Sequence, residues 1–331
     1  MTLNILTYNT SWKSTEPIKT DTFGILGKDC NTNVEQCRNN IRSIFFDKSK
    51  QYDFIGLQEL TNNLLHITDE DNSIEYSKTF EEYTLICRGV NIKKYGIIRC
   101  GILYNNLKYH PIFTVQGSIY SNKFKNREAG RMYIATLFQI INTNNIILII
   151  NGHFPHDTIN NITPFKYIQD EIKNSFNNIG IKINRNIPFI FVGDFNRDLS
   201  KLKPVSDFTF LDQSLLFNTN IKTCCTTDNV DRIKKIEYET DHIIFSKKFF
   251  IRPIYNTIDL YPASDHFALN ATIELKSDSL SKNSNPLSPL SPSSKTKDES
   301  EKVIGGKKYK VYKGTKSGKY IIKNGNKVYI K

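Results

Sequence analysis

Polar side chains that suit a metal ion or a phosphate group follow or precede several apolar runs of this 331-residue chain. One acid or amide at the end of a strand is most often a turn former. Acids, amides and imidazoles together at several strand ends would instead meet in one shared cleft, where they could bind a metal ion or a phosphate. The residues in such positions are Asn9, Glu59, His153, Asp194, Asn196, Asp265 and His266.

The apolar runs themselves predict the elements that position these side chains. Most runs have the short, β-branched and aromatic character of strands, whereas Asn33–Lys48 and a segment beginning at Thr163-Pro164 carry apolar residues at helical spacing. Many strands and few helices predict a layered α/β or α+β sandwich with its site at one edge of the sheets. The expected strands are Asn4–Tyr8, Asp53–Glu59, Ile97–Tyr104, Met132–Ile140, Ile146–Asn151, Ile187–Val192, Thr240–Ser246 and Phe267–Leu275.

Six short motifs occur in a fixed order, and together they resemble the endonuclease/exonuclease/phosphatase superfamily, the DNase I-like phosphoesterases. The resemblance covers nearly all of residues 1–275 and implies an α+β fold, a four-layer α/β/β/α sandwich with a cleft at the top of two packed sheets. The motifs are Tyr8-Asn9, Leu57-Gln58-Glu59, Asn151-Gly152-His153, Gly193-Asp194-Phe195-Asn196, Asp241-His242-Ile243-Ile244-Phe245 and Ser264-Asp265-His266.

The resemblance implies a divalent metal ion as cofactor. A phosphodiester is anionic and resists attack by hydroxide, so a hydrolase must neutralise charge and orient water. Mg²⁺, or Mn²⁺ in its place, suits this task because it prefers oxygen ligands and keeps several bound waters. On the family's pattern Glu59 is the first metal ligand, and Asn9 and Asp265 shape or complete the shell.

The same resemblance implies roles for five catalytic residues. Asp194 would orient or deprotonate the attacking water, and Asn196 would hold a phosphate oxygen. His266 would contact the phosphate with Asp241 as its carboxylate partner, a pairing that favours the imidazolium form. His153 would be the second imidazole on the phosphate.

The strand expected at Ile97–Tyr104 departs from part of the family. Members of the DNase I type pair the equivalent of His153 with an acid on this strand, but here the strand contains Arg99 and no acid. The sequence therefore does not predict two matched acid–imidazole pairs. Arg131 matches the family's strand-start arginine and is expected to bind substrate, with a structural salt bridge as the alternative.

The C-terminal part differs from the rest in charge and composition. The whole chain has a net charge of +12, of which 277–331 contributes +9 through 13 lysines and four acids. We expect a domain at 1–276, a disordered Ser/Pro-rich linker at 277–301 and a basic module at 302–331. The module predicts a small antiparallel meander with a hairpin turn at Asn324-Gly325. Its interleaved lysines and tyrosines suit nucleic acid or another polyanion, and a charge-protected docking sheet is the alternative.

This basic module also resembles the short adaptor repeats at the ends of proteins of large DNA viruses, which implies a viral assembly as a possible partner. The chain opens without the basic and apolar regions of a secretory signal, and no apolar run is long enough to span a bilayer. We expect an intracellular, non-secreted protein, in the host cytoplasm or the virion if its origin is viral. Its six cysteines are expected to be reduced, with the vicinal Cys224-Cys225 as a redox-active pair the alternative.

The leading functional hypothesis is a Mg²⁺-dependent nuclease that hydrolyses DNA or RNA. An inositol-phosphate or phospholipid phosphoesterase is the first alternative, because such enzymes share the motifs and differ in their loops. The expected substrate loops are Thr114–Asn126 and Thr223–Glu239. A non-catalytic nucleic-acid-binding or virion-packaged protein is the second alternative, and the intact motif set argues against it.

Overall fold

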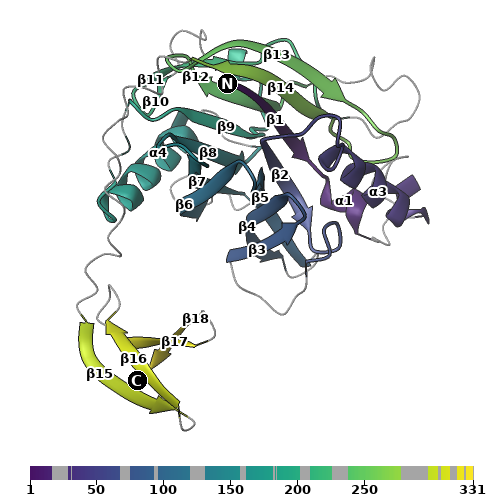
Figure 1. Ribbon diagram of the computed structural model, residues 1–331. Coiled ribbons are helices and arrows are strands. Elements are labelled where there is room, and N and C mark those ends of the chain that lie inside the picture. Colours follow the sequence, from purple (N-terminus) through teal and green to yellow (C-terminus); the bar gives the residue numbers. More distant parts are fainter. Residues whose placement is uncertain are drawn as a thin grey trace. The chain divides into compact units, whose positions relative to one another are not determined.

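A computed structural model describes the chain in two compact units, residues 1–283 and 284–331. Figure 1 shows the ribbon and its elements. The described residues are 1–16, 29–30, 32–67, 75–92, 96–119, 131–156, 162–181, 183, 185–201, 209–225, 238–276, 297–304, 307–313, 319–323 and 326–330.

The first unit contains two seven-stranded sheets. The first sheet consists of β1 (Thr2–Asn9), β2 (Phe54–Thr61), β3 (Glu75–Phe80), β4 (Tyr83–Ile92), β5 (Gly96–Asn105), β13 (Phe250–Ile258) and β14 (Ala268–Leu275). Its strand order is β13-β14-β1-β2-β5-β4-β3. Only β1 and β2 pair in parallel, so the carboxyl ends of these two central strands reach the same edge of the sheet.

The second sheet repeats this arrangement with a central parallel pair. It consists of β6 (Tyr109–Ser118), β7 (Met132–Ile140), β8 (Ile146–His153), β9 (Phe189–Asp194), β10 (Thr209–Phe210), β11 (Gln213–Phe217) and β12 (Asp241–Ser246). The order is β10-β11-β12-β9-β8-β7-β6, and β8 pairs in parallel with β9. The carboxyl ends of β8 and β9 therefore also lie together.

The two sheets pack face to face, and helices cover their outer faces (Figure 1). The helices are α1 (Trp12–Thr15), α3 (Val34–Phe45) and α4 (Ile162–Asn177), with a 3₁₀ turn at Leu199–Lys201. Ile41 and Phe45 of α3 are buried against the first sheet, and Phe165 and Phe176 of α4 are buried against the second. A third apolar cluster fills the space between the sheets. The predicted four-layer α/β/β/α sandwich is confirmed.

Local sequence explains which elements were predictable. Helix α3 begins where its side-chain cap allows, because Asn33 Oδ1 accepts a hydrogen bond from the Gln36 N–H. Strands β3, β4, β6, β10, β11 and β13 were not predicted, and two of them, β6 and β13, contain a proline, at Pro111 and Pro253. Proline disfavours a strand prediction. In both strands the pairing register shifts at that point, so a bulge accommodates the residue that cannot donate a ladder hydrogen bond.

The expectation of six reduced cysteines is wrong for four of them. Cys30 is disulfide bonded to Cys37 in α3, and Cys224 to Cys225, while Cys87 and Cys100 are free and buried. Cys30 and Cys37 are both inaccessible and pack beside Tyr261. The two cysteines are seven positions apart, which is a spacing that fits neither a zinc ribbon nor a C-x-x-C motif. Within the described part of the chain, no helix is long and apolar enough to cross a membrane.

The second unit holds a four-stranded antiparallel meander. Its strands are β15 (Lys297–Ile304), β16 (Lys307–Lys313), β17 (Lys319–Lys323) and β18 (Asn326–Ile330). β15 begins inside the stretch expected to be linker, and its pairing places Glu301 opposite Lys310. The turn expected at Asn324-Gly325 lies outside the described residues, although Lys323 and Asn326 on either side pair with each other.

Candidate active site

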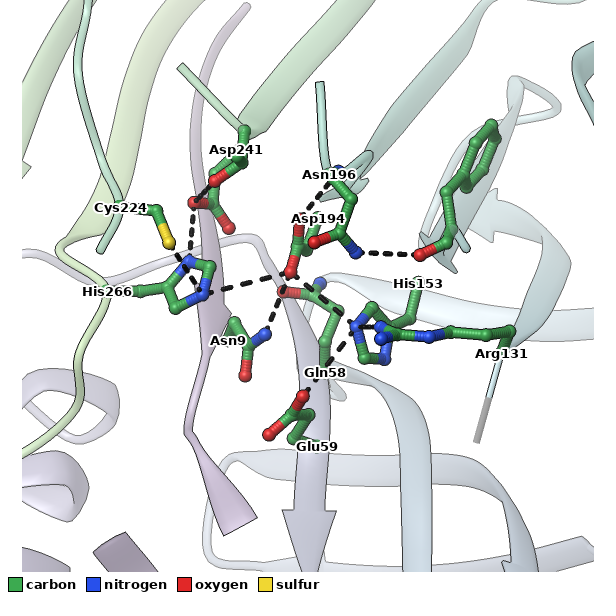
Figure 2. A network of polar contacts seen from close by, with 12 residues as sticks. Asn9, Gln58, Glu59, Arg131, His153, Asp194, Asn196, Cys224, Asp241 and His266 are labelled. Atoms are coloured by element: carbon green, nitrogen blue, oxygen red, sulfur yellow. Dashed lines mark hydrogen bonds and ion pairs between the residues drawn. The ribbon is translucent and has the colours of Figure 1, made fainter. Parts of the chain in front are cut away.

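The predicted site residues meet at one edge of the sandwich, where strands of both sheets end. β1 ends at Asn9, β8 at His153 and β9 at Asp194. Across the second sheet Asp194 is the register partner of both His153 and Asp241. The loop that precedes β14 adds His266. Figure 2 shows these side chains converging on the Asp194 carboxylate.

Two glycines allow the main chains around this edge to approach closely. A Cβ atom on Gly193 would collide with the carbonyl oxygen of Gly152 on the neighbouring strand. A Cβ atom on Gly56 of β2 would collide with the Val192 side chain of the facing sheet. Glycine at Gly193 and Gly56 is therefore required for the strand ends to lie near enough for their side chains to touch.

Asp194 is the centre of the polar network. Asn9 Nδ2 donates to its Oδ2 over 2.9 Å, and the Asn196 backbone N–H donates to its Oδ1 over 2.8 Å. Its side chain is buried. Burial and the neighbouring Asp241 carboxylate raise the pKa of Asp194 to about 7, against the opposing effect of His266. A carboxyl group with a pKa near neutrality can exchange a proton with water at physiological pH.

His266 is held by a chain of hydrogen bonds. Its Nδ1 lies 2.8 Å from Asp241 Oδ2, which also accepts a hydrogen bond from Thr240 Oγ1 over 3.0 Å. The Ser264 hydroxyl accepts from the His266 backbone N–H and donates to the Asn9 carbonyl. Burial alone would lower the pKa of His266, but the Asp241 carboxylate together with Asp194 and Asp265 outweighs this effect and raises that pKa to about 10. The ring is therefore an imidazolium at neutral pH.

His153 has different neighbours. Its Nε2 lies 3.6 Å from Asp194 Oδ2 and 3.8 Å from Glu59 Oε1, and the Arg131 guanidinium contacts the same nitrogen. Strand β5 supplies no acid here: its Arg99 is buried and donates from Nε to Asn62 Oδ1. The structure thus contains one acid–imidazole pair of the predicted kind, at His266. An arginine stands beside the other imidazole.

Glu59 sits at a local irregularity of strand β2. The pairing of β2 with β5 shifts register between Leu57 and Leu60, and Glu59 has a φ of +53°. A bulge with left-handed backbone is costly for a non-glycine residue and re-aims its side chain. Glu59 Oε2 accepts the Trp12 backbone N–H over 3.1 Å. Burial raises the pKa of Glu59, and the nearby Asp265 adds to the rise while Arg131 opposes it.

The donors around Glu59 fit a hard divalent cation. Glu59, Asn9 and Asp265 offer oxygen atoms, the ligands that Mg²⁺ and Mn²⁺ prefer. The raised pKa of Glu59 means that burial of its charge is not balanced by the protein's own cations, and a bound divalent ion would balance it. A second group of potential ligands on this edge consists of Asp194, Asp241 and His266. The predicted ligand set remains a hypothesis.

The remaining predicted features of the site are Asn196, in the loop after β9, and the two substrate loops. Asn196 has a φ of +53°, and its Nδ2 donates to the Phe154 carbonyl over 2.7 Å. This hydrogen bond anchors the loop after β9 and fixes the amide beside Asp194. Most of the expected loops at Thr114–Asn126 and Thr223–Glu239 lies outside the described residues.

Two amides that received no role from the sequence connect the sheets beneath the site. Asn151 Nδ2 donates to the carbonyls of Leu57 and Gly101, and Gln58 Nε2 donates to Asn151 Oδ1 over 2.6 Å. Both side chains are fully buried. Because Gln58 adjoins Glu59 and Asn151 lies two residues before His153, this bridge fixes the spacing of the two strands. The sequence could have singled out these two amides, because Gln58 lies in the motif Leu57-Gln58-Glu59 and Asn151 in the motif Asn151-Gly152-His153.

Comparison with solved structures supports the fold. The chain matches an endonuclease/exonuclease/phosphatase from Bacteroides vulgatus at 17% identity and a TM-score of 0.57, over 83% of this chain and 100% of the other. It matches the human Nocturnin catalytic domain with bound sulfate at 13% identity and a TM-score of 0.55, over 83% of this chain and 95% of the other. A mannosyl-6-phosphatase from Bacteroides thetaiotaomicron matches at 18% identity and a TM-score of 0.55, over 82% of this chain and 100% of the other.

No family model and no curated protein matches the sequence. The likeness lies in the arrangement of the two sheets and their covering helices. The chain therefore has the endonuclease/exonuclease/phosphatase fold, as its six motifs predicted. At this level of identity the solved structures establish the fold, and the chemistry must be argued from the site itself.

Proposed function

We propose that the chain is a metal-dependent phosphoesterase that hydrolyses phosphodiester bonds of nucleic acid. The observation that carries the proposal is the position of Asp194. Its Oδ2 lies 3.6 Å from His153 Nε2 and 3.9 Å from His266 Nε2, so one buried carboxylate stands between two imidazoles. Phosphate hydrolysis needs such an arrangement of a base for water and cationic groups for the phosphate oxygens.

The roles of the protein's own groups follow from their contacts. Asp194 accepts the proton of the attacking water, while the Asn9 amide keeps the carboxylate in place. His266, an imidazolium supported by Asp241, donates a hydrogen bond to a phosphate oxygen and stabilises the charge that develops there. Arg131 and His153 contact the phosphate from the other side, and Asn196 holds a further oxygen.

Glu59, with Asn9 and Asp265, would hold a divalent ion, which would supply Lewis acidity toward a phosphate oxygen or the leaving group. Asp194, His266, Arg131, His153 and Asn196 are then left for water and phosphate, whereas Asn9 would serve both the ion and, through Nδ2, the Asp194 carboxylate. The hard oxygen donors favour Mg²⁺ or Mn²⁺ over a soft ion. This division of labour separates the metal ligands from the proton acceptor.

Nucleic acid as the substrate is supported by charge. The whole chain carries +12, and the basic module contributes most of it. Lysines that neutralise phosphates release counterions and raise the local concentration of enzyme on a polynucleotide. We propose the residues 1–276 as the catalytic domain and 302–331 as the polyanion-binding module, joined by a linker.

The proposal is tested with labelled single- and double-stranded DNA and RNA, in Mg²⁺, in EDTA, and after Mg²⁺ is restored. We expect cleavage that EDTA abolishes and that Glu59→Gln and Asp194→Asn both lose. Asp212→Asn is the matched control, because Asp212 is exposed and pairs only with Lys173 at the surface. Full activity of Glu59→Gln in EDTA would refute metal-dependent hydrolysis at this site.

A phosphomonoester or lipid headgroup is the second candidate substrate. The mannosyl-6-phosphatase with the same fold shows that this scaffold also carries phosphomonoesterase activity. Inositol phosphates, phospholipids and sugar phosphates therefore belong in the same assay panel. Turnover of these compounds, with no cleavage of any oligonucleotide, would reassign the substrate while leaving the roles of Asp194 and Glu59 unchanged.

Deletion of residues 302–331 separates catalysis from docking. We expect the shortened chain to bind polynucleotides more weakly and with less dependence on salt, and to cleave short oligonucleotides at the full-length rate. If deletion removes all nucleic-acid binding and the full chain shows no turnover with any metal, the protein is a binding or packaging factor instead.

A further inference from the structure

We propose that Cys224, Cys225 and His266 form a second metal site, specific for a thiophilic ion such as Zn²⁺ and available only when the two cysteines are reduced. Their ligand atoms all lie within 4.8 Å of one another. The sulfur atoms of Cys224 and Cys225 have no part in the proposed hydrolysis. The vicinal cysteines therefore acquire a function of their own, beside an imidazole that the reaction uses.

The distance between sulfur and nitrogen fits one shared ion. Cys224 Sγ lies 3.3 Å from His266 Nε2, and Figure 2 shows the sulfur facing the ring. In tetrahedral zinc sites, Zn–S bonds of about 2.3 Å and Zn–N bonds of about 2.1 Å place the two donor atoms roughly 3.5 Å apart. Movement of a few tenths of an ångström would bring both atoms to ligand distance.

The main chain, not only the side chains, keeps the two residues together. The Phe267 N–H donates to the Thr223 carbonyl over 2.7 Å, so the residues that adjoin His266 and Cys224 are directly hydrogen bonded. Cys224 also forms an isolated antiparallel bridge with Tyr238. The proximity of sulfur and imidazole is thus fixed by the backbone and would survive reduction of the cysteine pair.

The histidine is already prepared to be a ligand. Its Nδ1 is hydrogen bonded to Asp241, which orients the ring and leaves Nε2 directed at the sulfur. A carboxylate on the far nitrogen is the usual support of a zinc-bound histidine. Cys224 is buried whereas Cys225 is exposed, so an ion can reach the site from solvent through Cys225.

Reduction and metal binding form a balanced sequence. A dithiol or phosphine reductant supplies two electrons to the Cys224–Cys225 bond, and two protons from water complete the thiols. Binding of Zn²⁺ then releases both thiol protons and the proton on His266 Nε2. Because the ion occupies the nitrogen proposed to contact phosphate, Zn²⁺ should inhibit hydrolysis. That last consequence rests on the proposed function, whereas metal binding itself does not.

Cobalt(II) is the probe for the site, since its bonds to thiolate give a charge-transfer band in the near ultraviolet. We expect this band when Co²⁺ is added to the reduced full-length protein, and its loss on addition of one equivalent of Zn²⁺. The Cys224→Ser and Cys225→Ser variants should lose the band. The Cys30→Ser/Cys37→Ser variant is the matched control and should retain it. No band in the reduced wild-type protein, or a band unchanged in folded Cys225→Ser, would overturn the proposal.

Inhibition provides the second measurement. We expect Zn²⁺ to inhibit reduced wild-type protein at a concentration at least ~10-fold below that needed for Cys225→Ser, each normalised to its own rate without zinc. Added Mg²⁺ should not relieve this inhibition. Relief by Mg²⁺ with equal sensitivity of both proteins would place the inhibitory ion at Glu59 and refute inhibition through the cysteine site.

Discussion

The two imidazoles of the candidate site are supported in opposite ways. His266 is hydrogen bonded to the buried carboxylate of Asp241, on the neighbouring strand end of the second sheet. His153 has the Arg131 guanidinium at its Nε2, which lies 3.6 Å from an Asp194 oxygen and 3.8 Å from a Glu59 oxygen. Asp194 lies between the two rings and is the only carboxylate near both of them within the described residues.

The two sides of the site therefore obtain their positive charge from different groups. On the His266 side an anion stabilises a cation, so the positive charge is fixed before substrate arrives. On the His153 side the positive charge comes from an arginine, which keeps it at any physiological pH. Two sources of positive charge therefore lie on either side of Asp194, and the one at His266 is supported by a neighbouring carboxylate.

Substitution of the shared carboxylate should have the largest effect. Asp194→Asn preserves size but removes the proton acceptor, so kcat for an oligonucleotide should fall by ~10³-fold, within the usual contribution of general base catalysis. Steady-state kinetics in Mg²⁺ give the value. The Asp212→Asn protein, in which an exposed acid becomes an amide, should keep wild-type kcat. A loss below about tenfold would assign the proton transfer to another group.

Substitution of Asp241, the hydrogen-bond partner of His266, should have the next largest effect. In Asp241→Asn an amide oxygen still accepts from His266 Nδ1, but the negative charge is lost. Asp241 Oδ1 is buried without a hydrogen-bond partner in the described structure, so the substitution displaces no contact of that atom. We expect kcat to fall by about 10²-fold and to decline with rising pH from a lower pH than in the wild type.

The decline in activity with pH tests the assignment to His266. In the wild-type protein the imidazolium persists to a pKa of about 10, whereas in Asp241→Asn it should titrate near its ordinary value of about 6.5. A pH–rate profile of the two proteins makes the comparison. Parallel profiles above pH 6 would show that the charge of His266 does not limit the reaction.

The fold was predictable because its information is local and repeated. Each strand that carries a motif is an apolar run. Helix α3 can be recognised from the helical spacing of its apolar residues and from Asn33 at its N-cap. Strands β3, β4, β6, β10, β11 and β13 were missed, and in β6 and β13 a bulge accommodates a proline that disfavours a strand prediction. Only the pairing partners of those strands specify the bulge, and the sequence does not reveal partners.

The sequence predicted which residues would lie near one another more fully than it predicted their contacts. Asp241 and His266 followed from motif positions, and the structure places them 2.8 Å apart. The proximity of Arg131 to His153 depends on the register of β7 and β8, where Met132 opposes His153. The proximity of Cys224 to His266 depends on a hydrogen bond between two loops. Such contacts arise from the packing of distant segments, which a single sequence leaves open.

Substitution on the His153 side should have a smaller effect than loss of Asp241. In Arg131→Gln we expect kcat/KM to fall by about tenfold, since one cationic contact is lost while Asp194 and His266 remain. Arg131→Lys restores charge without the forked geometry and should recover part of the loss. Arg252→Gln is the control, because that arginine is exposed and lies near Glu274 at the surface. A loss equal to that of Asp241→Asn would make the two sides equivalent and remove the asymmetry.

The smallest expected effect is on stability, and it isolates the His266 side without any substrate. The folded protein raises the pKa of His266 from about 6.5 to about 10, so the stabilisation is complete below pH 6.5 and is lost as the pH rises through 10. The raised pKa of Asp194, about 7, acts in the same direction at lower pH. In EDTA, Tm should therefore fall between pH 6.5 and 10, and roughly 1 kcal/mol corresponds to about 2–4 °C. Asp241→Asn should flatten this fall, because the imidazolium then loses its partner in the folded state, whereas Arg131→Gln should leave the part of the fall near pH 10 unchanged, because Arg131 acts on the pKa of Asp194 and not on that of His266. An equal slope in wild type and Asp241→Asn would mean that the Asp241–His266 pair is no stronger than the contacts around His153.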